Sequence, residues 1–93
     1  MRASLSDQQL ISLYLSGDEA AFETLLNRHQ QQVYSKIFFI VRDSDLANDL
    51  FQDTFIKVVN TLKSGKYNEE GKFLPWVMRI AHNLSIDHFR RGK

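Results

Sequence analysis

Residues 18–62 read DEAAFETLLNRHQQQVYSKIFFIVRDSDLANDLFQDTFIKVVNTL, and this stretch predicts a hairpin of two helices. On both sides of the polar break 42–45, apolar residues recur at spacings of three and four, the period of one helix face. The stripe before the break is Phe22, Leu25, Leu26, His29, Val33, Ile37, Ile40 and Val41, and the stripe after it is Leu46, Leu50, Thr54, Phe55, Val58, Val59 and Leu62. Because the break is short, helices over 18–41 and 44–63 are expected to pack antiparallel. Either Asp43 or Ser44 can cap the second of them.

Two further helices flank this hairpin. Ser6 is a good N-cap with Gln9 at the capping-box position, and Gly17 suits a helix end, so a helix is expected over about 6–16. Residues 64–72 are a polar loop with two glycines. Pro75 fits the first turn of a helix over about 73–90. The expected fold class is therefore all-α, a compact bundle of about four helices forming a single domain over 1–93.

Composition excludes several classes of protein. The chain has 93 residues, of which 43% are hydrophobic and 25% charged, as in an ordinary folded domain. It has no cysteine, which excludes a disulfide framework and a thiolate metal site. The longest apolar run, residues 37–41, is far shorter than the roughly 20 residues that span a bilayer. We therefore expect a soluble cytoplasmic protein with no cofactor and no membrane insertion.

Charge is unevenly distributed along the chain. Residues 1–60 hold five basic and eight acidic side chains, whereas residues 61–93 hold seven basic and three acidic ones. An acidic front and a basic back suggest two partner surfaces, the basic one suited to a polyanion.

The outward face of the third helix carries a patch of polar and acidic side chains. Asp49, Gln52, Asp53 and Ile56 fall together at helical spacing. The patch is either an ordinary solvated face or a docking surface for a basic partner, with Ile56 as a small apolar anchor.

The fourth helix has a distinctive outward face. If its inward face is Val77, Ile80, Ala81, Leu84 and His88, its outward face is Arg79, His82, Asn83, Ile86 and Arg90. Arginine, amide and a flanking aromatic, Trp76, suit single-stranded nucleic acid, because guanidinium neutralises phosphate and an indole can stack on a base. Trp76 can equally be a core residue, and Asp87 can pair with Arg90 or Arg91.

Two motifs carry a resemblance to a known family. Residues 49–55 read DLFQDTF, and residues 73–91 read FLPWVMRIAHNLSIDHFRR. Together with residues 18–25 and Tyr34, they resemble the N-terminal domain, region 2, of bacterial extracytoplasmic-function (ECF) sigma factors. The resemblance covers essentially the whole chain. One departure is Asn48, where that family frequently has an acidic residue.

The resemblance implies two interfaces. The third-helix patch would bind core RNA polymerase at a coiled coil of its largest subunit, through Asp49, Gln52 and Asp53, with Ile56 beside them. The loop Gly65–Lys72 and the fourth helix would open the −10 promoter element and hold a flipped base of the non-template strand. With the outward face and basic end of that helix, the expected DNA-binding set is Lys66, Tyr67, Asn68, Lys72, Trp76, Arg79, His82, Asn83, Arg90 and Arg91.

The resemblance also implies further partners and regions. An anti-sigma protein would regulate the domain. Residues 90–93 are expected to begin a linker to a helix-turn-helix domain that these 93 residues do not include.

Three other functions compete with this interpretation. An enzyme is disfavoured because His29, His82 and His88 are scattered and there is no glycine-rich phosphate loop. A helical protein-interaction domain without DNA recognition explains the acidic face but not the basic half. A reader of double-stranded DNA would need a short helix-turn-helix with a glycine turn, which the sequence lacks.

Overall fold

The computed structural model describes residues 4–67 and 72–91. Its helices are α1 (Asp7–Leu15), α2 (Glu19–Val41), α3 (Ser44–Lys63) and α4 (Phe73–Arg91). Each begins and ends within one residue of its expected position, and no strand occurs in the described ranges. The prediction of an all-α bundle of four helices is therefore confirmed.

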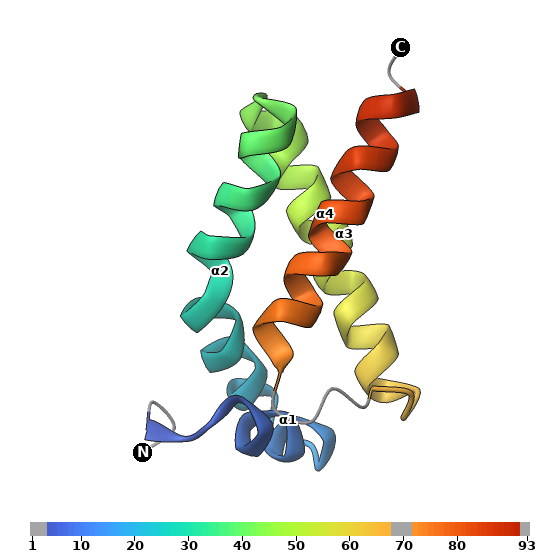
Figure 1. The fold of residues 1–93 in the computed structure, drawn as a ribbon. Coiled ribbons are helices and arrows are strands. Elements are labelled where there is room, and N and C mark those ends of the chain that lie inside the picture. Colours follow the sequence, from blue (N-terminus) through green and yellow to red (C-terminus); the bar gives the residue numbers. More distant parts are fainter. Residues whose placement is uncertain (1–3, 68–71, 92–93) are drawn as a thin grey trace.

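The helices form a three-helix bundle with a fourth helix across one end (Figure 1). α2 and α3 make the antiparallel hairpin that the sequence predicts, and α4 runs back alongside both of them. α1 lies at the end of the bundle where α2 and α4 begin and α3 ends. The described residues of the polar loop between α3 and α4, 64–67 and 72, are at this same end.

Short polar contacts set where the helices begin and end. In α1, Ser6 Oγ accepts from the Gln9 amide at 3.1 Å and Gln9 Oε1 accepts from the Ser6 amide at 2.8 Å, which completes the capping box. After α1, Gly17 adopts a φ of +115°, and the Asp18 amide donates to the Leu13 carbonyl at 3.0 Å. This is the Schellman arrangement that favours glycine.

The turn between α2 and α3 is equally well defined. Arg42 has a φ of 55°, in the left-handed region, and its amide donates to the Phe38 carbonyl. Asp43, rather than Ser44, is the N-cap of α3, and its Oδ1 accepts from the amides of Asp45 and Leu46 at 3.0 and 3.1 Å. Two residues therefore suffice to reverse the chain.

Within the described residues, the core is apolar apart from the buried polar side chains of His29, Thr54 and Ser85. Fully buried side chains come from all four helices, among them Leu10, Leu25, Val33, Ile37, Val58, Leu62, Phe73 and Val77. Thr54 and Ser85 are also fully buried, and each hydroxyl donates to the carbonyl four residues earlier in its own helix at 2.8 Å. These bonds satisfy the hydroxyls without a partner from another helix.

One expectation about the inward face of α4 is wrong. His88 is exposed, and the inward face ends instead at the buried Ser85. Residues 87–90 are all exposed, because the C-terminal end of α4 lies apart from the end of the α2–α3 hairpin (Figure 1).

Two other features are absent from the described part of the chain. No helix there is long and apolar enough to cross a bilayer. No group of three or more histidine, aspartate or glutamate side chains there could hold a metal ion.

Candidate functional site

The acidic patch on α3 is exposed, as the helical spacing predicts. Asp49, Gln52 and Asp53 are exposed. Ile56, which follows them on the helix, has 58% of its surface exposed. Neither Asp49 nor Asp53 forms an ion pair with any described residue. The patch therefore offers uncompensated carboxylates next to an exposed apolar side chain, which suits a basic partner.

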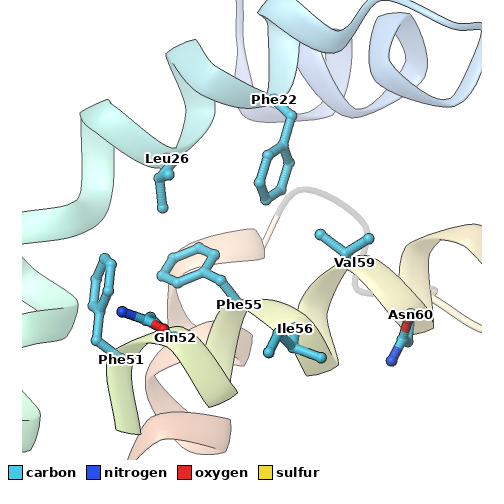
Figure 2. A pocket seen from close by; sticks show the side chains of 8 residues that line it. All are labelled: Phe22, Leu26, Phe51, Gln52, Phe55, Ile56, Val59 and Asn60. Atoms are coloured by element: carbon cyan, nitrogen blue, oxygen red, sulfur yellow. The ribbon is translucent and has the colours of Figure 1, made fainter. Parts of the chain in front are cut away.

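An apolar groove of about 440 Å³ runs beside this patch, between α2 and α3 (Figure 2). Phe22 and Leu26 point from α2 toward Phe55 on α3. The whole lining is Phe22, Leu26, Phe51, Gln52, Phe55, Ile56, Val59 and Asn60. The helical period correctly places most of these apolar residues on the facing sides of α2 and α3. It cannot show that Phe22, Leu26, Phe51 and Val59 are only half-buried.

A second groove, of about 540 Å³, lies on the opposite flank of α3, against α4. Its lining is more polar: Asp53, Ile56, Lys57, Asn60, Thr61, Ser64, Lys66 and Leu84. Of these residues, only Lys66 is among the DNA-binding residues expected from sequence. Most of the other lining residues could have been found from the helical period, because residues 53, 57, 60, 61 and 64 lie on one flank of α3.

The outward face of α4 is confirmed for its charged and amide residues. Arg79, His82, Asn83 and Arg90 are exposed, while Ile86 is only half-exposed. Lys72, immediately before the helix, is also exposed. The cations Lys72, Arg79 and Arg90 and the amide of Asn83 are therefore accessible on or next to α4. Lys66, which precedes α4 in the chain, lines the second groove.

Trp76 does not belong to this exposed face. It is only 9% exposed and packs between Tyr67, with ring centroids 4.6 Å apart, and Phe73, at 5.9 Å. The reason is helical spacing, because Trp76 lies three residues after Phe73 and four before Ile80, both buried. In this conformation the indole packs against Tyr67 and Phe73 and is not presented to a base.

Two of the expected DNA-binding residues cannot be placed. Asn68 lies outside the described residues. Arg91 is the last residue of α4, but its side chain is outside what the structure describes. Tyr67 is half-buried against Trp76, so its ring also belongs to the loop's support.

Comparison with known proteins identifies the family. The family model Sigma-70 region 2 matches residues 25–93. The chain belongs to this family. Over 80 residues this region 2 domain is 38% identical to the RNA polymerase sigma factor CarQ of Myxococcus xanthus, covering 86% of this chain and 45% of that protein. It is 29% identical over 92 residues to the ECF RNA polymerase sigma factor SigM of Mycobacterium tuberculosis, covering 99% of this chain and 46% of that protein.

A solved structure has the same fold. An engineered region 2 of sigmaE, determined by NMR in complex with GTAAAA, superposes with a TM-score of 0.80 at 33% identity, covering 94% of this chain and 88% of that one. The resemblance to ECF sigma factors expected from residues 49–55 and 73–91 is thus confirmed. This region 2 domain spans about half the length of the curated relatives it matches.

Proposed function

We propose that this region 2 domain is a transcription initiation module that binds core RNA polymerase and captures single-stranded DNA of the −10 promoter element. The observation that carries the proposal is the two-sided character of α3. An apolar groove whose lining includes Gln52 and Ile56 lies on the flank toward α2. A more polar groove, whose lining includes Lys57 and Lys66 together with Asp53, lies on the flank toward α4. The sigmaE relative bound to GTAAAA supports the same use of this fold.

The polymerase would bind the exposed face of α3 and its flank toward α2. Asp49 and Asp53 on the exposed face supply negative charge, Gln52 an amide, and Ile56 an exposed apolar contact at the rim of the apolar groove. Asp53 also lines the groove against α4. A basic, amphipathic partner such as the coiled coil of the largest polymerase subunit would satisfy all of these groups. Since these side chains are exposed, the surface needs no rearrangement before docking.

The DNA would bind the flank toward α4. Lys57, Lys66, Lys72, Arg79 and Arg90 can neutralise phosphates. Thr61 and Asn60 line the groove between α3 and α4, and Asn83 is exposed on α4, so these side chains can donate to and accept from a base edge. The groove volume of about 540 Å³ is within the ~300–1,000 Å³ of pockets that bury small organic groups.

On this proposal the domain contributes recognition, and RNA synthesis is the chemistry of the polymerase. The function would be exercised in the cytoplasm, where transcription takes place in bacteria. An anti-sigma protein would act by covering one of the two surfaces.

A helical protein-interaction domain without DNA recognition is the alternative, and the apolar groove between α2 and α3 favours it. One experiment separates the two functions. Core polymerase, alone and with the 93-residue chain, is incubated with a fluorescent pool of random single-stranded hexamers, and the retained sequences are determined. We expect the chain to add binding with a base preference. Binding to core without any added retention of DNA would instead support the alternative.

A further inference from the structure

Asp7, at the start of α1, ties two adjacent residues of α2. Arg28 Nη1 donates to one carboxylate oxygen at 2.9 Å, and His29 Nε2 donates to the other, also at 2.9 Å. His29 is 8% exposed, and its Nδ1 is buried with no hydrogen-bond partner among the described residues. The bond to Asp7 therefore fixes the orientation of a buried imidazole ring.

The other side of that ring contacts the start of α4. His29 and Phe73 have ring centroids 5.8 Å apart, and Phe73 is 1% exposed. Phe73 contacts Tyr67 at 6.3 Å and Trp76 at 5.9 Å, and these two rings lie 4.6 Å from each other. We call Tyr67, Phe73 and Trp76 the aromatic clasp.

The clasp holds the two ends of the polar loop together. Tyr67 is next in sequence to Lys66, which lines the groove between α3 and α4, and Phe73 is next to the exposed Lys72. Shifting the clasp would therefore move the groove wall formed by Lys66. A binding site depends on the residues that hold its walls as well as on those that touch the ligand.

We propose that His29 is a positioning residue for DNA binding: it acts through Phe73 to hold the clasp, and with it the groove between α3 and α4, in the arrangement that accepts a base. The inference rests on the proposed function. Its distinctive claim is that a residue on α2, tied to α1 and remote from the exposed faces, sets the affinity for DNA. A purely structural role would show itself in stability alone.

The test compares two substitutions of His29 in holoenzyme reconstituted from core polymerase and the 93-residue chain. His29→Ala removes the ring, whereas His29→Phe keeps an aromatic ring against Phe73 and loses the bond to Asp7. The probe is the hexamer that wild-type holoenzyme prefers from the random pool. If the groove holds its binding arrangement only a tenth of the time in His29→Ala, affinity for that hexamer falls about tenfold. His29→Phe should recover most of that loss.

A matched control separates positioning from stability. Val33→Ala lies one turn further along α2, is fully buried in the wild type, and should lower the melting temperature while leaving the hexamer affinity and core binding unchanged. The proposal is overturned if His29→Ala binds the hexamer as well as wild type, or if Val33→Ala at equal loss of melting temperature loses affinity equally. A wild-type holoenzyme with no preferred hexamer would instead overturn the proposed function, and this inference with it.

Discussion

Ile56 and Asn60, one helical turn apart on α3, each line both grooves of the molecule. They form a ridge with the apolar groove against α2 on one side and the polar groove against α4 on the other. Gln52 lines only the first groove, and Thr61 lines only the second. The two proposed partners would therefore meet the same helix on opposite flanks, separated by the width of two side chains.

This ridge predicts that single substitutions can separate the two activities. Gln52→Ala should cost about 1–2 kcal/mol of polymerase binding free energy and leave single-strand affinity at a fixed holoenzyme concentration unchanged. Thr61→Val should weaken single-strand affinity and leave polymerase binding unchanged, because it removes a hydroxyl from the second groove only. Ile56→Ala should weaken both. Equilibrium titrations of labelled core and labelled hexamer measure the two affinities, and equal effects of Gln52→Ala on both would contradict the division into flanks.

Charge reversal tests the acidic patch more severely. Asp49→Lys combined with Asp53→Lys should abolish co-purification with core polymerase, because a basic partner would then meet two like charges. The expected change in unfolding free energy is within about 0.5 kcal/mol for each site, since both side chains are exposed. Glu23→Lys, at an exposed acid on α2, is the control for a general charge effect. Retention of core by the doubly reversed protein would remove the patch from the docking surface.

The N-cap of α3 predicts a change in stability that leaves both proposed binding surfaces intact. Asp43 Oδ1 accepts from two backbone amides, so Asp43→Ala should lower the unfolding free energy by about 0.5–2 kcal/mol. Chemical denaturation monitored by circular dichroism measures the change, with Asn48→Ala, an exposed site in the same helix, as the control. Equal stability of the two variants would show that the turn does not depend on this cap.

The helices could be predicted from sequence because their signals are local. Ser6, Gly17 and Pro75 mark helix ends through hydrogen-bonding and dihedral preferences that act within a few residues. The exposed Asp49, Gln52 and Asp53 follow from the same period, because the face opposite an apolar stripe points to solvent. The roles proposed for these residues come from the family resemblance, because the helical period alone says nothing about a partner.

The exposure of His88, the contact between Trp76 and Tyr67, and the two grooves depend on how the helices are arranged in space. His88 satisfies the inward period of α4 but is exposed, because the end of α4 lies apart from the α2–α3 hairpin (Figure 1). The helical period allows Trp76 to face inward, but its contact with Tyr67 joins residues nine apart in sequence and cannot be predicted from that period. The grooves on the two flanks of α3 likewise arise from the spacing between helices. A one-dimensional period cannot supply that spacing.

The last prediction separates attraction to the DNA backbone from reading of a base on α4. Arg79, Asn83 and Arg90 share the exposed face, so the arginines should contact phosphates and Asn83 a base. Arg79→Ala or Arg90→Ala should weaken binding to all single strands alike and flatten the log–log salt dependence by about 0.7 per lost contact. Asn83→Ala should leave that slope nearly unchanged and cost about 1–3 kcal/mol of discrimination at one position.

The measurement is a titration of holoenzyme with the preferred hexamer and its single-base variants at several salt concentrations. Lys63→Ala, at an exposed cation of α3 that lines neither groove, is the matched control and should leave the salt slope unchanged. If Asn83→Ala lowers affinity equally for every hexamer, Asn83 contacts the backbone rather than a base. If neither arginine alters the slope, the outward face of α4 is not the DNA surface. The lysines of the α3–α4 groove would then have to supply the electrostatic attraction, since Lys57 and Lys66 are the cations that line it.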